Sequence, residues 1–90
     1  MNDFIKGIVT NVIDGKTIEM DVTQIGRKNF FDYNKKEKVH VLGIRPFLYV
    51  INNHHSWKSL IEKILLGKGV TCVVNSRNAD GEIAGEVFLL

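Results

Sequence analysis

The sequence predicts a small, mainly β domain in which five strands and one helix form a closed barrel, in the order β-β-β-α-β-β. Short runs rich in β-branched residues are separated by turns that contain glycine. A single segment has helical periodicity, and ninety residues are too few for a second domain. Closure removes the exposed strand edges that so small an open sheet would have to protect.

The first two expected strands, residues 4–12 and 17–22, are joined by a tight turn. Apolar residues alternate with polar ones around this turn, which is typical of strands with one buried face. Asp14 and Gly15 lie between the strands, and an Asp-Gly pair suits a hairpin because glycine has no Cβ to clash at positive φ. The chain therefore begins with a predicted antiparallel hairpin.

The middle of the chain contains the third expected strand. Residues 26–38 are polar, basic and without a clear period, and we expect a loop or an irregular ribbon there. Residues 39–44 are too apolar to face water on both sides and are expected to form the strand. Pro46 ends or bends it, because proline lacks the N–H that a central ladder needs. Residues 47–51 suit a short extension, and residues 52–55 a connection.

One helix follows, over residues 57–65. Ser56 can cap its first turn, and Gly67 suits the left-handed position after its last turn. We expect its apolar side to be a core face rather than a groove for a partner. That stripe consists of Trp57, Leu60, Ile61, Ile64 and Leu65.

The last two expected strands are residues 70–74 and residues 82–90, joined by a turn over residues 78–81. The first of them is rich in β-branched residues, which favour strands. A helix between the third and fourth of five strands is the order of an OB-type barrel. Residues 1–90 are therefore expected to form a single OB-fold domain.

Composition and charge restrict the class of protein. The net charge of +2 is too small to identify a polyanion binder by itself. Cys72 is the only cysteine, so no internal disulfide can form and a reducing compartment is expected. The N-terminus lacks the apolar core of a secretory signal, and no run approaches the roughly 20 apolar residues that span a bilayer. We expect a soluble, cytoplasmic domain without a membrane partner or a cofactor.

Four segments resemble the staphylococcal nuclease (thermonuclease) family. Residues 12–18, V-I-D-G-K-T-I, are similar to its first hairpin and its D-G-D-T signature. Residues 39–45, V-H-V-L-G-I-R, are similar to the strand that the family writes V-R-L-L-G-I-D. Residues 60–74 resemble its helix and fourth strand, and residues 80–87 resemble its Y-G-R-x-L-A segment. The resemblance implies a nuclease-like OB barrel over most of the chain.

The catalytic residues that the resemblance implies are absent. Lys16 and Arg45 stand where the family has the two aspartates that hold calcium, a hard cation that takes oxygen ligands. His40 and Glu82 stand where it has the arginines that stabilise the phosphoryl transition state. Leu48 replaces the glutamate that acts as general base, and a hydrocarbon cannot accept a proton. The resemblance therefore implies a nuclease-like pseudoenzyme that holds no metal.

A cluster of cations and aromatic rings suggests a binding role. OB barrels bind single-stranded DNA or RNA with cations on phosphates and rings on bases; alternatively, the rings pack on the barrel and the lysines keep a loop soluble. Lys16 and Arg45 are expected near one mouth of the barrel, either holding a phosphate without a metal or simply solvated. The cluster contains Arg27, Lys28, Lys35, Lys36 and Lys38 with Phe30, Phe31 and Tyr33, offset by Asp32 and Glu37. The candidate nucleic-acid-binding residues are Lys16, Arg27, Lys28, Phe31, Tyr33, Lys35, Lys36 and Arg45.

A protein-interaction or homodimerisation domain is the alternative function. The nuclease family continues into further helices after the fifth strand, whereas this chain reads Val87-Phe88-Leu89-Leu90 there. The surface that those helices cover would then meet a protein partner or a second copy. An apolar last strand that is simply buried explains the same residues.

Catalysis and metal binding have weaker sequence support. Asp14, Glu19 and Asp21 are the nearby carboxylates that a residual metal-dependent phosphodiesterase would need, and of these Glu19 and Asp21 share a strand face. A phosphate-binding loop would need glycine where Thr10 stands. A zinc site formed by His40, His54, His55 and Cys72 is also disfavoured, because these residues lack a defined ligand spacing.

Overall fold

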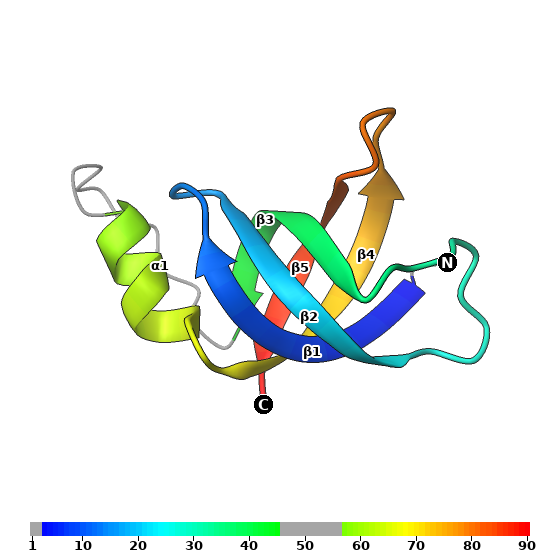
Figure 1. Ribbon diagram of the computed structural model, residues 1–90, viewed down its shortest axis with the longest axis horizontal. Helices are drawn as coiled ribbons and strands as arrows, with labels where there is room; N and C mark the ends of the chain where they lie inside the picture. Colours follow the sequence, from blue (N-terminus) through cyan, green and yellow to red (C-terminus); the bar gives the residue numbers. More distant parts are fainter. Residues whose placement is uncertain (1–2, 46–56) are drawn as a thin grey trace.

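The computed structural model describes residues 3–45 and 57–90, which form a closed five-stranded barrel with one helix (Figure 1). The strands are hydrogen-bonded in the order β1-β2-β3-β5-β4, and β4 pairs with β1 to close the barrel. β3 and β5 run parallel, and the other pairs are antiparallel. The predicted order of elements is confirmed. The elements are β1 (Asp3–Val12), β2 (Thr17–Ile25), β3 (Lys36–Arg45), α1 (Trp57–Leu65), β4 (Gly69–Arg77) and β5 (Ile83–Leu89).

The core fills the interior of the barrel because each strand alternates inward and outward side chains. In β1, residues 3–9 alternate buried and exposed without interruption. Gly7 lies at a register shift between β1 and β2, where a Cβ would overlap the carbonyl oxygen of Asp21, so the crossing needs glycine. The buried apolar residues are Ile5, Val9, Val12, Ile18, Met20, Val39, Ile61, Leu65, Val70, Cys72, Val74, Ile83 and Val87.

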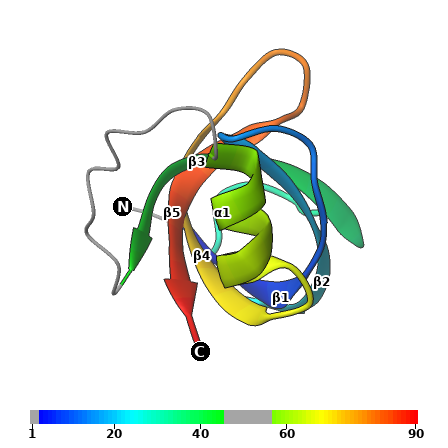
Figure 2. The same ribbon diagram turned by 90° about the vertical axis from the view of Figure 1, so that its left-hand side faces the viewer.

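Helix α1 lies across one end of the barrel (Figure 2). Ile61 and Leu65 are buried in the core, and Ile64 packs against it, which confirms the core-face prediction for this part of the stripe. Gly67 has a φ of 77° and its N–H donates to the carbonyl of Val9, so the end of the helix is bonded to β1. The packing of these side chains and the bond from Gly67 to Val9 together hold the helix over the core.

The third strand begins three residues earlier than predicted. Lys36 and Lys38 lie opposite Asp21 and Glu19 of β2, so the loop predicted over residues 26–38 ends at residue 35. Between them, Glu37 points inward and is buried. A charged residue at an inward position hides the apolar alternation by which strands are detected.

Some predictions fall outside the described residues. These include the strand end at Pro46, the extension over residues 47–51 and the helix cap at Ser56. Leu48 and the pair His54 and His55 also lie in this segment.

Candidate functional site

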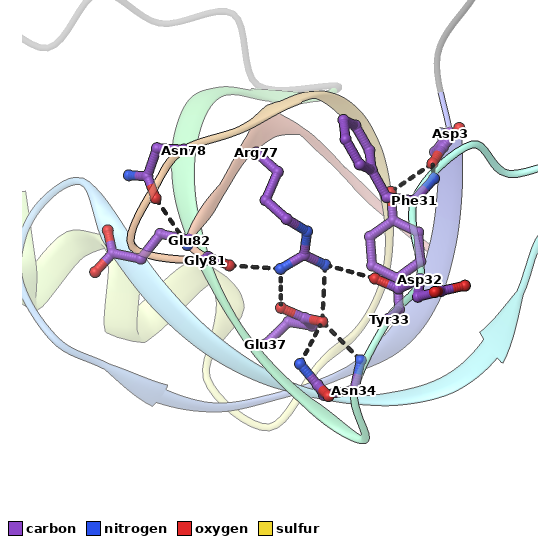
Figure 3. A network of polar contacts seen from close by, with 10 residues as sticks. All are labelled: Asp3, Phe31, Asp32, Tyr33, Asn34, Glu37, Arg77, Asn78, Gly81 and Glu82. Carbon is purple, nitrogen blue, oxygen red and sulfur yellow. Dashed lines mark hydrogen bonds and ion pairs between the residues drawn. The ribbon is translucent and has the colours of Figure 1, made fainter.

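The β2–β3 loop, residues 26–35, is fastened to the barrel by a buried carboxylate. Asp3, the first residue of β1, accepts hydrogen bonds from the N–H groups of Phe30 and Phe31 at 2.7 and 2.8 Å. The Tyr33 hydroxyl donates a third bond at 2.7 Å. Figure 3 shows Asp3 and Phe31 in this arrangement. One side chain therefore fixes the middle of the loop at three points.

These contacts determine how the two groups titrate. Burial by itself would raise the pKa of Asp3, but the N–H groups of Phe30 and Phe31 and the Tyr33 hydroxyl outweigh it and hold the pKa below its ordinary value. Burial, together with the bond to the Asp3 carboxylate, raises the pKa of Tyr33. The carboxylate therefore stays an acceptor and the hydroxyl stays a donor.

A second buried carboxylate fastens the other end of the loop. Glu37 accepts two bonds from the Arg77 guanidinium, Nη1 to Oε1 at 3.3 Å and Nη2 to Oε2 at 3.1 Å. The Glu37 side chain is 2% exposed and that of Arg77 is 18% exposed. Glu37 also accepts the N–H of Asn34 at 2.7 Å. This is a bidentate, largely desolvated ion pair, which is stronger and more directional than a surface pair.

Arg77 connects three parts of the molecule (Figure 3). Besides Glu37 of β3, it donates to the carbonyl of Gly81 in the β4–β5 turn. It also donates to the carbonyl of Asp32 in the β2–β3 loop at 2.9 Å. Because all three acceptors converge on one guanidinium, the loop, the turn and β3 are held in a fixed relation.

The aromatic residues of the loop divide into two kinds. The Tyr33 ring lies 5.1 Å from the Arg77 guanidinium carbon, and the Phe31 ring lies 6.0 Å from it. Both rings are partly buried, and Phe31 packs edge-on against Phe30 at 5.0 Å between centroids. Phe30, by contrast, is 85% exposed. The rings of Phe31 and Tyr33 therefore pack within the loop and against Arg77, whereas the ring of Phe30 is exposed to solvent.

The cations of the loop are mostly exposed. Arg27, Lys28 and Lys35 are exposed to solvent. Lys36, the first residue of β3, is exposed as well, but its ammonium lies 3.0 Å from the carboxylate of Asp21, and this contact raises the pKa of Lys36. Lys36 is therefore paired with a carboxylate, and Arg27, Lys28 and Lys35 are the cations that the loop exposes to solvent.

Lys16 lies at the opposite end of the barrel, in the β1–β2 turn beside α1 (Figure 1). Its N–H donates to Asp14 at 2.8 Å, and its carbonyl accepts the N–H of Val41. The bond from the Lys16 N–H is the main reason why the pKa of Asp14 is lowered. Along β3, Val41 is five residues from Lys36, or about 17 Å. The structure therefore does not bring Lys16 together with the loop.

The positions that match the nuclease site are only partly described. Thr17, next to Lys16, pairs with His40, which in turn pairs with Ala84 of β5, two residues after Glu82. Arg45 pairs with β5 through its backbone, but its side chain lies outside the described part, as does Leu48. The expected proximity of the Lys16 and Arg45 side chains therefore stays a prediction.

Metal-ligand clusters are not found in the part of the chain that the structure describes: no three His, Cys, Asp or Glu residues there are placed to hold an ion. His40 is exposed on the outside of β3. Cys72 is buried in the core, and burial raises the pKa of its thiol to about 12. These two members of the disfavoured zinc set therefore face different sides of the barrel.

Sequence reasoning missed Asp3 and Arg77, two residues that organise the site. Asp3 and Arg77 occupy the first and last positions of strands, where polar residues are ordinary. Apart from Gly81, which is four residues from Arg77, their partners are 27 to 45 residues away, so no local spacing reveals them. The available signal was indirect: a carboxylate, Glu37, at an inward position of β3.

No protein-family model matches the chain, and a search of the curated proteins also finds no match. Within residues 3–45 and 57–90, no helix has both the length and the hydropathy to cross a membrane. The fold and the site therefore define a small closed β-barrel with one capping helix and a fastened, basic β2–β3 loop.

Proposed function

We propose that this chain is an OB-fold, nuclease-like barrel that binds single-stranded nucleic acid through the β2–β3 loop and does not hydrolyse it. The OB assignment is supported by the strand order β1-β2-β3-β5-β4 with a helix between β3 and β4. The observation that carries the function is the loop itself: two buried carboxylates hold it, and it presents an exposed Phe30 among Arg27, Lys28 and Lys35.

The fastening distinguishes this loop from one that is merely soluble. A solubilising loop needs neither buried anchors nor an exposed phenylalanine, which is unfavourable in water. Ordering a loop in advance removes an entropy cost that binding would otherwise meet. The arrangement of Asp3, Glu37 and Arg77 therefore fits a surface whose shape matters to a ligand.

The chemistry of the loop suits a single strand. Arg27, Lys28 and Lys35 supply positive charge for phosphates, and Phe30 supplies a face on which an unpaired base can stack. Phe31 and Tyr33 keep the loop in shape. The outer face of β2 and β3 is less suitable, because Lys36 and Lys38 alternate there with Asp21 and Glu19.

The absence of hydrolysis is supported by the contacts of the nearby carboxylates. Asp14 accepts the N–H of Lys16 within its own turn, and Asp21 pairs with Lys36. Glu19 lies opposite Lys38. A cytoplasmic location belongs to the same proposal and is supported by the lone Cys72, which has no second cysteine to pair with.

The test is fluorescence anisotropy with labelled oligo-dT and oligo-U at about 50 and 200 mM salt, with and without calcium. If three cations each neutralise a phosphate, the logarithmic salt slope is about −2, and the fourfold rise in salt weakens binding about 20-fold. The double variant Lys28→Ala, Lys35→Ala should bind more weakly. The matched control is Lys58→Ala, Lys63→Ala, which removes the same charge from α1 at the other end of the barrel.

Three results would contradict the proposal. They are no binding at low salt, binding that does not respond to salt, or an equal loss in the α1 control variant. Cleavage of the oligonucleotide on addition of calcium would contradict the inactive, nuclease-like part alone.

A protein-interaction function is the second candidate, because β5 ends in exposed apolar side chains. Phe88 is 38% exposed, and Leu90 beyond it is 77% exposed. Val87, the residue before Phe88, is buried in the core, so the core uses only part of this apolar segment. Light scattering that gives a dimer mass, lost in Phe88→Ser, would favour this candidate over the nucleic-acid module.

A further inference from the structure

Phe4 is an outward-facing aromatic residue next to the β2–β3 loop. Along β1, Asp3 and Ile5 are buried, whereas Phe4 and Lys6 face outward. Phe4 is 52% exposed. A single exposed apolar side chain is ordinary on a protein surface, so the contacts around Phe4 decide whether its ring has a role.

The first part of the loop closes on the Phe4 backbone. The Gly26 N–H donates to the Phe4 carbonyl at 2.9 Å. The Asn29 side chain accepts the Phe4 N–H at 3.0 Å and donates to the Phe4 carbonyl at 2.8 Å. Asn29 thus takes the place of a neighbouring strand, and Arg27 and Lys28 are held between two anchors on one residue.

Phe30 is fixed beside the same point of β1. It follows Asn29 directly, and its N–H donates to Asp3, the residue before Phe4. Consecutive residues of the loop, Asn29 and Phe30, are therefore bonded to consecutive residues of β1, Phe4 and Asp3. The two exposed phenylalanines of this region belong to one rigid unit.

The charge around this unit is positive. Lys6, Arg27 and Lys28 are exposed, whereas the Asp3 carboxylate is buried and saturated by donors from the loop. Asp32 is the exposed carboxylate that the loop adds. Exposed rings among cations match unpaired bases joined by phosphates, because stacking needs a free base face and the backbone needs positive charge.

We propose that Phe4 and Lys6 extend the binding site from the loop onto the outer face of β1. Phe4 and Phe30 each stack on an unpaired base, and Lys6, Arg27 and Lys28 contact the phosphates. This proposal rests on the proposed function. It assigns nucleic-acid binding to residues of β1, which the sequence pattern did not include among the candidate binding residues. The ligand is an unpaired strand, and a duplex, whose base faces are covered, should bind weakly.

The test measures anisotropy with labelled oligo-dT, oligo-U and a duplex of equal length, on the full chain. Phe4→Ala should weaken binding to the single strands by about fivefold to more than a hundredfold, the range expected for one lost stacked base. Phe4→Trp should bind at least as well as the wild type. The matched control is Ile8→Ala, which truncates another outward side chain of β1 that is 46% exposed. Circular dichroism of each variant establishes that the barrel is intact.

The outcomes distinguish the role of Phe4 from the proposed binding of a single strand by the β2–β3 loop. If the wild type does not bind, both proposals are wrong. If the wild type binds and Phe30→Ala weakens binding while Phe4→Ala does not, only the role of Phe4 is wrong. Equal losses in Phe4→Ala and Ile8→Ala, or full binding by Phe4→Leu, would show a general apolar surface of the kind that docks a protein and would overturn the stacking assignment. Oligo-dT and oligo-U together determine whether the strand is DNA, RNA or either.

Discussion

Replacement of Arg77 by leucine should lower the free energy of unfolding by a large fraction of its total. The Arg77→Leu variant removes the cation from Glu37, whose side chain is 2% exposed in the wild type, and it also removes the donors to Asp32 and Gly81. Breaking a buried pair on one side typically costs about 3–5 kcal/mol. A domain of this length has a total stability of about 5–13 kcal/mol, so the loss is a large fraction of it.

A second ion pair in the same barrel provides the control. The Lys36–Asp21 pair has nearly the same length, 3.0 Å against 3.1 Å for Arg77–Glu37, but its side chains are 53% and 52% exposed. Exposed pairs are screened by water and contribute little. Lys36→Met should therefore leave the urea midpoint unchanged within error. The distance is nearly the same in the two pairs, so a difference in stability comes from burial together with the further bonds of Arg77 to Asp32 and Gly81.

The assay is urea unfolding followed by circular dichroism, in a cycle of Arg77→Leu, Glu37→Leu and the double variant. The double variant should be more stable than the sum of the single losses predicts, by about 2–3 kcal/mol, because no unpaired buried charge remains. It also provides a folded species if Arg77→Leu alone does not fold. A midpoint for Arg77→Leu that shifts no more than that of Lys36→Met, or a coupling near zero, would refute the reasoning.

Two further predictions concern the anchors of the barrel. Tyr33 has a raised pKa, so the folded state keeps a proton that the unfolded chain loses. The stability that this proton provides is present below about pH 10 and should fall as the pH rises above it. Tyr33→Phe should make this slope smaller, although the raised pKa of Lys36 keeps part of it, and should cost about 1.5–3 kcal/mol at neutral pH for the lost bond to Asp3. Urea midpoints at about pH 9 and pH 11 check this, and an unchanged slope in the variant would contradict it. Gly7→Ala should cost about 3 kcal/mol of stability, because the new Cβ overlaps the Asp21 carbonyl. Gly43→Ala is the control and should be nearly neutral, because its Cβ meets its nearest atom at 4.0 Å. Thermal unfolding measures both, and similar losses at the two positions would argue against the close crossing of β1 and β2 at Gly7.

The parts of the fold that the sequence predicted correctly depend on local signals. The hairpin between β1 and β2 lies where the Asp14-Gly15 pair and alternation along a few residues predicted it. The expected positive φ at Gly15 is wrong, however: among the described residues only Gly67 and Gly81 have one, and Asp14 instead stabilises the turn by accepting the Lys16 N–H. The helix needs only a stripe of apolar residues at helical spacing. Each of these patterns is complete within about ten residues, so one chain segment is enough to detect it.

The candidate site depends on contacts that no local pattern contains. Glu37 reads as one more charge in a basic run until Arg77, 40 residues later, is placed beside it. The same is true of Asp3, whose donors begin 27 residues away. The rings of the run, Phe30, Phe31 and Tyr33, look equivalent in sequence, and only the anchors decide which is buried and which is exposed. The sequence could therefore locate the cluster, but it could not show which of its rings are partly buried and which is exposed.

The buried acids are more informative about function than the basic run that first indicated it. Apolar residues in place of Asp3 and Glu37 would suit a barrel core and would avoid the desolvation of two charges. They would, however, leave the N–H groups of Phe30, Phe31 and Asn34 without acceptors, and the loop would lose its fixed shape. The two carboxylates are thus buried at a desolvation cost, and their bonds fix a surface loop, which indicates that the shape of the loop matters. Because the bonds that give the loop its shape also link it to β1, β3 and β4, we expect the loop to remain ordered until the barrel itself unfolds. The proposed binding surface would then be formed before any ligand binds.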